Sequence, residues 1–355
     1  MAIAPIQGVS TTLLTIPVTP VRAVAPAVRA DVEIAQAKTP QTPEAAQAEA
    51  RAKAVVEAVQ TAAPRQTALG PLFADLGQAL KTRALPAQVQ AAAAQVLAQA
   101  TPLGPRLDGA AIARAFLQSG LFLEHSLGAR PNVSPAGRDL KADLLTLRQA
   151  LSAWLGEAPR APGERTAAAP PPPYRGGPTT AQPPAQASLP ADASPAAIGQ
   201  RLVQDAEGAL ARHELLQAAS LPAAQNHEAD AQTTRWMFEV PFVSPQGATV
   251  AQFEISRDEA GPGGREAGRG PTYRARFSID LDPLGPLHAQ VALSGDHAGV
   301  TLWAERSDSV ALLRRAQPAL SQALAQVALR SDVAVYPGSP PRSAPGAGRF
   351  LDQST

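Results

Sequence analysis

The sequence contains no cysteine. Disulfide bonds, thiol nucleophiles and cysteine metal sites are therefore excluded. Aromatic residues are also scarce, at 4% of the chain, whereas prolines number 36 and glycines 26. A chain with so few large side chains and so many prolines cannot bury a core along its whole length. We expect one or two small folded units within a long, loosely ordered frame.

The chain also lacks a dominant charge and a long apolar run. It has 31 Lys and Arg residues against 30 Asp and Glu residues, so it offers no strong attraction to nucleic acid or to an anionic membrane surface. No run of about 18 apolar residues is present. The amino terminus has no basic region and is interrupted by Pro5, Pro17 and Pro20. These features predict neither membrane insertion nor a cleavable signal peptide.

The most regular part of the sequence runs from Tyr273 to Tyr336. Apolar and polar residues alternate from Tyr273 to Ile279, as expected for a strand with one buried face. The same alternation at 287–293 and 300–304 predicts a hairpin, and residues 333–336 predict a short final strand. Between the first two strands, LDPLGP removes ladder donors and places Gly285 where a positive φ is allowed. This segment predicts a tight turn.

A helical pattern follows the third of these strands. Ser307 is a suitable N-cap, and Val310 and Leu313 follow at helical spacing. A proline inside a helix costs about 3 kcal/mol, so Pro318 predicts two short helices, the second beginning near Gln317. The apolar face of the second helix is expected to comprise Leu320, Leu324 and Val327.

A helix and a second hairpin are predicted immediately upstream. Ser194 and Pro195 predict the start of a helix that runs to about Gln217. Residues 236–242 and 251–255 alternate on either side of PQG, which predicts a hairpin. Pro241 places the first of these strands at the edge of its sheet, because a central strand needs the donor that proline lacks.

Four helices are predicted nearer the amino terminus. Those at 43–61 and 86–100 have narrow apolar stripes, so we expect the first to be solvated and the second to add little packing energy. Those at 108–123, capped by Asp108, and at 138–155 have stronger stripes. We expect these two to bury their stripes against each other as a helical hairpin.

Residues 158–196 are dominated by Pro, Ala, Gly and Thr and include four consecutive prolines. They predict an extended linker with polyproline II character. The fold class is therefore α+β, with a small C-terminal domain of β-hairpins and two short helices after a mostly helical, partly disordered region and this linker. The expected segments are 1–70 (largely disordered), 71–157 (helical), 158–196 (linker), 197–270 (helix plus β-hairpin), 271–338 (C-terminal domain) and 339–355 (disordered tail).

The C-terminal elements resemble a known family. FSIDLDPLGPLHAQVAL, VTLWAERSDSVALLRRAQPALSQAL and VAVY, in this order, resemble the C-terminal domain of flagellar hook-length control proteins. The family's Leu-x-Pro-x-x-Leu-Gly turn is matched by Leu281, Pro283, Leu284 and Gly285, although here Leu284 follows Pro283 directly. A weaker similarity covers 209–257.

The resemblance implies a secreted ruler and specificity switch of the flagellar type III export apparatus, acting by protein contact. It implies that the C-terminal domain binds the cytoplasmic domain of the export-gate switch protein, and that hook and hook-cap subunits contact the amino-terminal part. The protein would be cytoplasmic before export, by an uncleaved amino-terminal signal, to the growing hook and the outside. A type III secretion regulator that measures no length is the alternative.

Partner-binding residues are predicted in the turn and the hairpin, because loops and sheet edges offer recognition without dismantling the core. Trp303 lies opposite Val300 and Leu302 on its strand, so it is either an exposed anchor or covered by a helix. The predicted contact residues are Leu281, Pro283, Leu284, Gly285, Leu287 and Trp303.

A hydrolase that uses Asp282 and His288 is the remaining alternative. The sequence has no His-Glu-x-x-His motif, no Gly-x-Ser-x-Gly elbow and no clustered metal-ligand spacing. Aspartates in turns also commonly bond to their own backbone. We therefore predict no catalytic activity, no cofactor and no metal.

Overall fold

The structure is a computed structural model. The chain divides into two compact units, Met1–Ala46 and Gln47–Thr355, and the fold below is that of the second. Expectations for residues 1–42 and for the tail beyond 341 lie outside the described residues, which are 43–83, 85–104, 107–129, 139–156, 169–190, 192–222, 233–244, 246–258 and 270–341.

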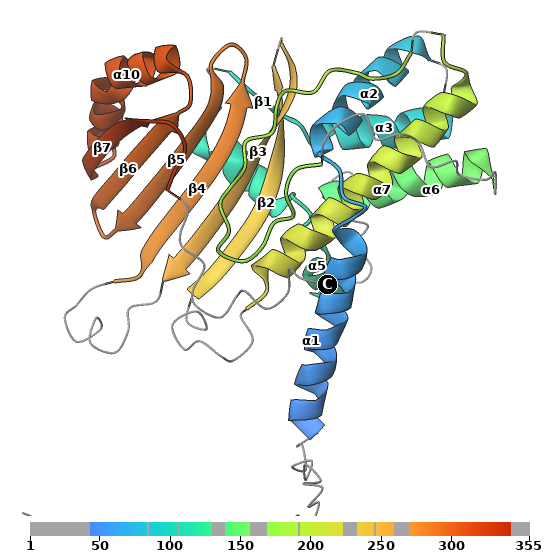
Figure 1. The fold of residues 1–355 in the computed structure, drawn as a ribbon, viewed down its shortest axis with the longest axis horizontal. Coiled ribbons are helices and arrows are strands. Elements are labelled where there is room, and N and C mark those ends of the chain that lie inside the picture. The colour runs from blue at the N-terminus through green and yellow to red at the C-terminus, as the bar shows by residue number, and fades with distance from the viewer. Residues whose placement is uncertain are drawn as a thin grey trace, which may run out of the picture. The chain divides into compact units, whose positions relative to one another are not determined.

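A seven-stranded mixed sheet dominates the described part of the chain, and its strands lie side by side in sequence order (Figure 1). Neighbours from β2 to β6 are antiparallel, whereas the outer pairs β1–β2 and β6–β7 are parallel. The α+β class is confirmed. The strands are β1 (Thr101–Pro102), β2 (Thr233–Ser244), β3 (Gly247–Asp258), β4 (Thr272–Leu281), β5 (Gly285–Ser294), β6 (His297–Ala304) and β7 (Arg330–Pro337).

The predicted hairpins form the centre of this sheet. The 236–255 hairpin is β2–β3, the 273–293 pair is β4–β5, and the 287–304 hairpin is β5–β6. Because β2 has only the two-residue β1 on its other side, Pro241 lies near a sheet edge, as its missing donor requires. The sheet continues from β3 to β4 across residue 270, where the sequence pattern suggested a segment boundary.

Three of the helices begin at side-chain caps. The side chains of Asp108, Asp139 and Ser194 each accept a hydrogen bond from the backbone N–H three residues later. None of the described helices is long and apolar enough to cross a bilayer. The helices are α1 (Pro43–Ala62), α2 (Leu69–Thr82), α3 (Ala87–Ala98), α4 (Gly109–Leu117), α5 (Leu123–Ala129), α6 (Leu140–Leu155), α7 (Pro195–Ser220) and α10 (Ser307–Gln326).

The C-terminal helical segment is one helix, so the prediction of two short helices is wrong. Pro318 lies inside α10 on its exposed side, as do Arg314 and Arg315. Water can bond the carbonyl that the proline leaves without an intrahelical donor, which lowers the cost of the interruption. Val310 is buried against Ala304 and Val335, whereas Leu320 and Leu324, expected in a core, are half-buried.

One face of the sheet carries an apolar core. Phe238, Phe253 and Phe277 are cross-strand neighbours on β2, β3 and β4, and successive ring centroids lie 5.2 and 5.3 Å apart. Phe116 of α4 packs on this row, 4.7 Å from Phe238. The expected hairpin of α4 with α6 is therefore wrong, because Ile112 and Phe116 of α4 pack, partly buried, against the apolar cluster of the sheet instead.

A second core lies between helices. α6 packs against α3 and α7, and α2 packs against α3, α7 and β3. α2 was not predicted from the sequence, and α3 contributes more than expected. Its alanines let the neighbouring helices approach closely. As a result, Val89, Ala93 and Val96 are each at most 1% exposed.

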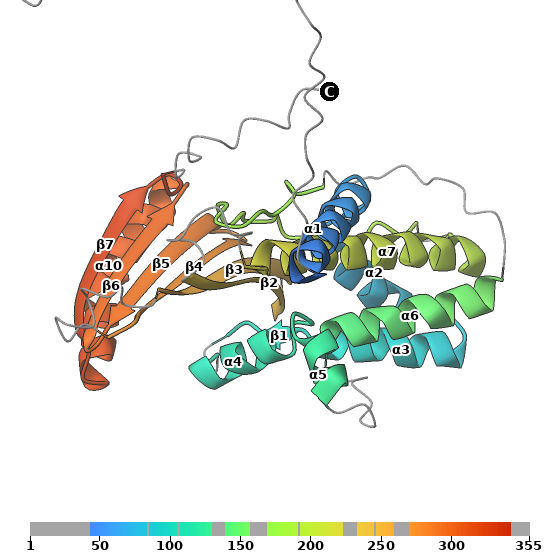
Figure 2. The same cartoon turned by 90° about the horizontal axis from the view of Figure 1, so that it is seen from below.

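Residues 169–190, here called the strap, cross the other face of the sheet in front of β2–β4 (Figure 1). The strap and α4 lie on opposite sides of the sheet (Figure 2). Thr180 N–H donates to Gln252 Oε1 at 2.7 Å, and Gln182 donates to Glu239 at 2.7 Å. The composition of this segment predicts a free spacer, whereas in the structure it is bound to the sheet. A polyproline II segment has no internal hydrogen bonds, so its polar groups need partners elsewhere. Polar side chains of the sheet provide them.

Candidate partner-binding site

The predicted turn joins β4 to β5 through Asp282, Pro283 and Leu284. Its closing pair is Leu281 and Gly285, the Asp282–Pro283 peptide is cis, and Gly285 has a φ of 75°. The turn is held at both ends. Thr249 of β3 donates its hydroxyl to the Asp280 carbonyl at 2.7 Å, and Ser309 of α10 donates to the Leu284 carbonyl at 2.6 Å. The backbone of the turn is therefore fixed by the elements on either side.

Replacing Gly285 with alanine is expected to lower the free energy of unfolding by more than the about 1–2 kcal/mol that a left-handed alanine costs. The added Cβ would lie 2.6 Å from Cδ of Arg306, so this side chain must also move. The free energy can be measured by urea denaturation.

Gly295→Ala is the matched control, because Gly295 also has a positive φ, of 59°, but no atom within 4 Å of an added Cβ. The two variants share the backbone strain and differ in the displacement of Arg306. Equal losses of stability in the two variants would show that displacing the Arg306 side chain has no measurable cost.

A cavity of about 350 Å³ lies beside the turn. Leu281 and Leu284 form part of its apolar wall together with Leu103, which follows β1, and Pro184 of the strap. Segments distant in the sequence therefore meet at one end of the sheet. The lining residues are Leu103, Pro184, Ser244, Gln246, Gly247, Thr249, Asp280, Leu281, Asp282, Pro283 and Leu284.

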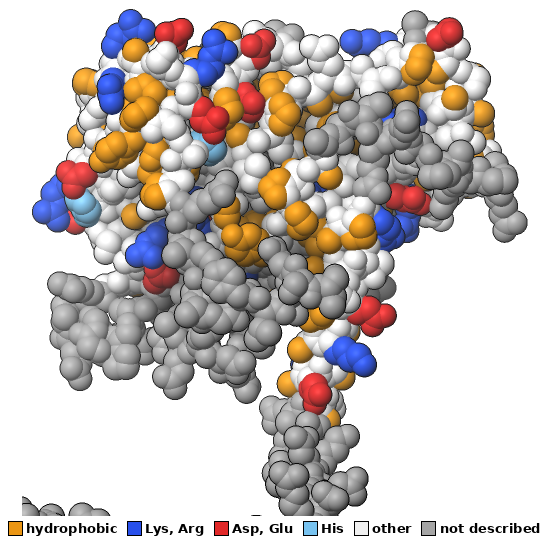
Figure 3. Space-filling view, in the orientation of Figure 1, with side chains coloured by type: hydrophobic (Ala, Val, Ile, Leu, Met, Phe, Trp, Pro, Cys, Tyr) orange, Lys and Arg blue, Asp and Glu red, His pale blue; other side chains and the backbone are white. Residues whose placement is uncertain are grey.

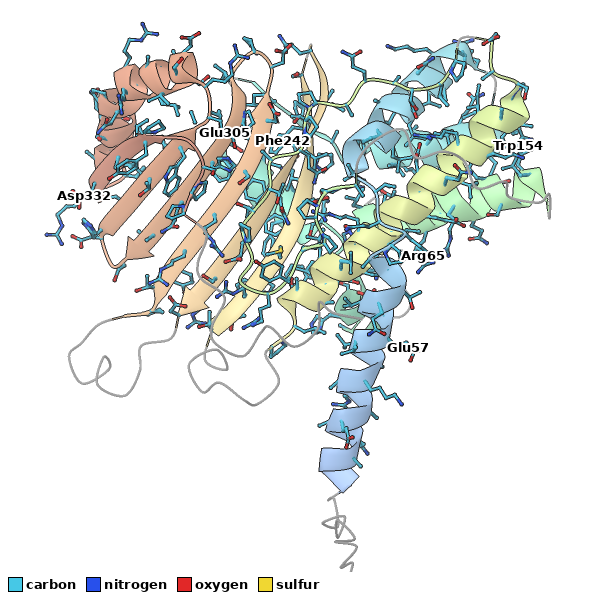
Figure 4. All side chains as sticks on the ribbon, in the orientation of Figure 1. Glu57, Arg65, Trp154, Phe242, Glu305 and Asp332 are labelled. Atoms are coloured by element: carbon cyan, nitrogen blue, oxygen red, sulfur yellow. The ribbon has the colours of Figure 1, made fainter. Side chains whose placement is uncertain are left out.

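Acidic side chains accompany this cavity. Burial raises the pKa of Asp280 above its ordinary value, and the neighbouring charges of Glu305 and Asp282 raise it further. Figure 3 shows acidic side chains beside a histidine on the upper part of this face, and Figure 4 labels Glu305 at that end of the strands. Acidic side chains at this end of the sheet thus lie next to an apolar hollow, although basic side chains are also present along the upper edge in Figure 3.

The residues of the hydrolase alternative are not brought together. His288 lies with its Nδ1 2.6 Å from Ser278 Oγ and its Nε2 3.3 Å from Glu305 Oε1, whereas Asp282 lies in the exposed turn. The group of Ser278, His288 and Glu305 has the residue types of a hydrolytic triad. However, Ser278 is 0% exposed and its hydroxyl also contacts Thr179 of the strap at 2.7 Å. Because a substrate cannot reach this oxygen, we interpret the group as an attachment point for the strap.

The structure separates the six predicted contact residues. Leu281, Pro283 and Leu284 line the cavity, and Gly285 closes the turn. Leu287 packs instead in the two apolar clusters of the opposite face. Trp303 is half-buried on the strap face, away from α10, with its ring centroid 6.3 Å from that of Tyr336. Their role in partner binding stays a prediction.

Sequence reasoning missed the more distant walls of the cavity. Pro184 and Thr249 enter the site through the packing of the strap and the pairing of β3, neither of which has a local signal. Asp280 is not among the contact residues predicted from the sequence, although it lies only two residues before the turn.

Residues 261–344 match the family model described as flagellar hook-length control protein FliK. No curated protein matches the chain, and no solved structure matches it either. The match contains β4–β7, α10 and the whole β4–β5 turn, and it confirms the resemblance seen at 273–336. It does not extend to 209–257 or to the cavity walls contributed by Leu103, Pro184 and the β2–β3 hairpin.

Proposed function

Because residues 261–344 match the flagellar hook-length control family, which is not an enzyme family, we propose that this chain is a hook-length control protein. It acts by protein contact as an exported ruler and as the specificity switch of the flagellar type III export apparatus. The observation that carries the proposal is the β4–β5 turn, which lies within the matched region, is held by Thr249 and Ser309, and faces a cavity.

The proposed partner of the C-terminal domain is the cytoplasmic domain of the export-gate switch protein. Loops fixed by a rigid scaffold are suited to recognition because little ordering entropy is lost on binding. Asp282 and Pro283 are exposed while Leu281 and Leu284 are half-buried, so the turn presents contact area without unfolding the core.

The chain's role in the switch is tested by hook length in cells that lack it. We expect hooks longer than normal without filaments, since export would not change to filament subunits. Hooks of normal length that carry filaments would contradict the proposal. If the chain binds the export gate but its loss leaves hook length unchanged, it is instead a secretion regulator without a ruler.

The contact itself is tested with the full chain and the export-gate domain. Replacing Pro283 and Leu284 with alanine is expected to weaken binding at least about tenfold, a loss of about 1.4 kcal/mol. The matched control is Leu312→Ala, because Leu312 is an exposed leucine of α10 outside the turn. Trp303→Ala, measured in parallel, shows whether the strap face also contributes.

The ruler function is proposed for the amino-terminal part and for residues 158–168, with hook and hook-cap subunits as partners. The strap is hydrogen-bonded to the sheet and to α2, so an insertion within it would disturb the fold. Insertions at 158–168 are therefore the sharper test. Hooks should lengthen with the insertion, and a constant hook length would leave only the switch function.

A further inference from the structure

The carboxylates at the cavity differ from the others of the sheet in having no cationic partner. Within the described part of the chain, neither Asp280 nor Asp282 forms an ion pair or accepts a hydrogen bond through its carboxylate. Most other acids of the sheet are paired with arginines, in the pairs Glu239–Arg212, Glu254–Arg235, Glu254–Arg276, Asp258–Arg274 and Asp296–Arg330, and Asp332 contacts His297.

The uncompensated charge disfavours the ionised form of Asp280 in the free protein. Its pKa is raised by burial and by the charges of Glu305 and Asp282. A cation between the carboxylates of Asp280 and Asp282 would relieve this repulsion and form charge-assisted hydrogen bonds. The side chain of Arg306 lies against Gly285 of the same turn but forms no ion pair with either carboxylate among the described residues, so both can accept a cation from a partner.

The apolar wall limits what accompanies the cation. At about 350 Å³, the cavity is at the small end of the range for binding sites, which starts at about 300 Å³. It has room for one or two side chains and not for a helix laid along a groove. Leu103, Pro184, Leu281 and Leu284 suit a compact apolar side chain.

We propose that this cavity binds a short segment of a partner protein in which an Arg or Lys residue neighbours a compact apolar residue. The cation lies between Asp280 and Asp282, and the apolar side chain packs against Pro184, Leu281 and Leu284. The inference rests on the proposal that the β4–β5 turn contacts a partner, and it specifies the chemistry of the bound segment. Because Pro184 belongs to the strap, the site requires the chain upstream of the family match.

The test compares two capped tetrapeptides, Ala-Leu-Arg-Ala and Ala-Leu-Gln-Ala, titrated into the full chain. Binding is followed by the NMR shifts of amide signals from the β4–β5 turn. At low ionic strength the arginine peptide is expected to bind about tenfold more tightly, and added salt should reduce this preference.

Two double variants show whether the preference belongs to the cavity. Asp280→Asn with Asp282→Asn should abolish it, and the fold should survive because the substitution removes a repulsion. Asp296→Asn with Asp332→Asn removes the same charge near the opposite end of the strands, where Figure 4 labels Asp332 on β7, and should leave the preference unchanged.

Equal binding of the two peptides, no binding of either, or a preference that persists without the Asp280 and Asp282 charges would each overturn the inference. Binding of the export-gate domain is measured on the same proteins. If the gate domain binds and the peptides show no preference, the proposed function stands and the inference fails. If the peptide preference is found and the gate domain does not bind, the site chemistry stands and the proposed partner is wrong.

Discussion

Replacing Arg212 with methionine is expected to lower the free energy of unfolding by about 3–5 kcal/mol, the usual cost of leaving a buried charge unpaired. Arg212 is 1% exposed, and its Nε donates to Glu239 Oε1 at 2.9 Å. Its Nη1 donates to Gln66 at 2.8 Å and to the Pro171 carbonyl at 2.7 Å. The substitution therefore leaves the carboxylate of Glu239 buried without its cationic partner, and it also removes the donor to the Pro171 carbonyl of the strap. Urea denaturation at neutral pH measures the loss.

Two further proteins separate the unpaired charge from the loss of packing. A variant that also carries Glu239→Leu should recover much of the stability, because no unpaired buried charge then remains at this position. Arg330→Met removes an arginine from the exposed pair with Asp296 and should leave the unfolding midpoint almost unchanged. A double variant no more stable than Arg212→Met alone would show that the ion pair is not the cause.

Between about pH 7.5 and pH 5, wild type is expected to lose about 2 kcal/mol of stability relative to His213→Leu. Burial lowers the pKa of His213 from 6.5 to about 4, and the charge of Lys141 lowers it further. Between these pKa values the unfolded chain binds a proton that the folded chain does not. The stabilisation is thus fully present above about pH 6.5 and is lost as the pH falls towards 4. Unfolding in urea at several pH values measures the difference.

The control for this pH dependence is His125→Leu, because His125 is exposed on α5. It should follow the pH dependence of wild type. Burial raises the pKa of Asp139 and of Asp205 to about 6, so both carboxyls oppose the histidine on acidification, but they titrate in all three proteins and cancel. Parallel curves for wild type and His213→Leu would contradict a neutral buried His213.

The sequence pattern predicts the sheet well because each strand carries its own signal. Period-2 alternation marks β2 to β6, and glycine marks the turns between them, accompanied by proline except between β5 and β6. The predicted caps Asp108 and Ser194 lie where helices begin, because capping is decided within one turn of the chain. These features depend on neighbours in sequence, so no tertiary knowledge was needed. The predicted cap Ser307 is wrong, since α10 begins after Arg306 without a side-chain cap.

The errors concern packing between distant segments. The contribution of α3 to the helical core is underestimated from the sequence, because an alanine-rich face gives a weak periodic signal. Alanine nevertheless allows close helix contact. The strap has the composition of a free linker, and only the folded sheet supplies the side chains that bind it. From the sequence, Pro318 predicts the end of a helix, because the sequence does not show that this residue faces solvent.

The candidate site was predictable only in part, because some of its residues have a local sequence signal and others are brought there by packing. The turn at 281–285 has a local signal in its prolines and glycine, and three of its residues line the cavity. The other walls come from β1, the strap and the β2–β3 hairpin, which are brought there by sheet order. Trp303 was placed on the correct side of its strand by alternation, but alternation cannot show that α10 covers the other side.

The pairing of β3 with β4 affects where a fragment of this protein can begin if it is to be expressed alone. The family match begins at residue 261, between these two strands. A fragment cut there would turn β4 from an interior strand into a bare edge, remove Glu254 from Arg276, and expose Phe277 where Phe253 now covers it. An uncovered edge of this kind recruits strands from other copies. Self-association of the excised fragment would then report the loss of its neighbouring strand and not a property of the intact chain.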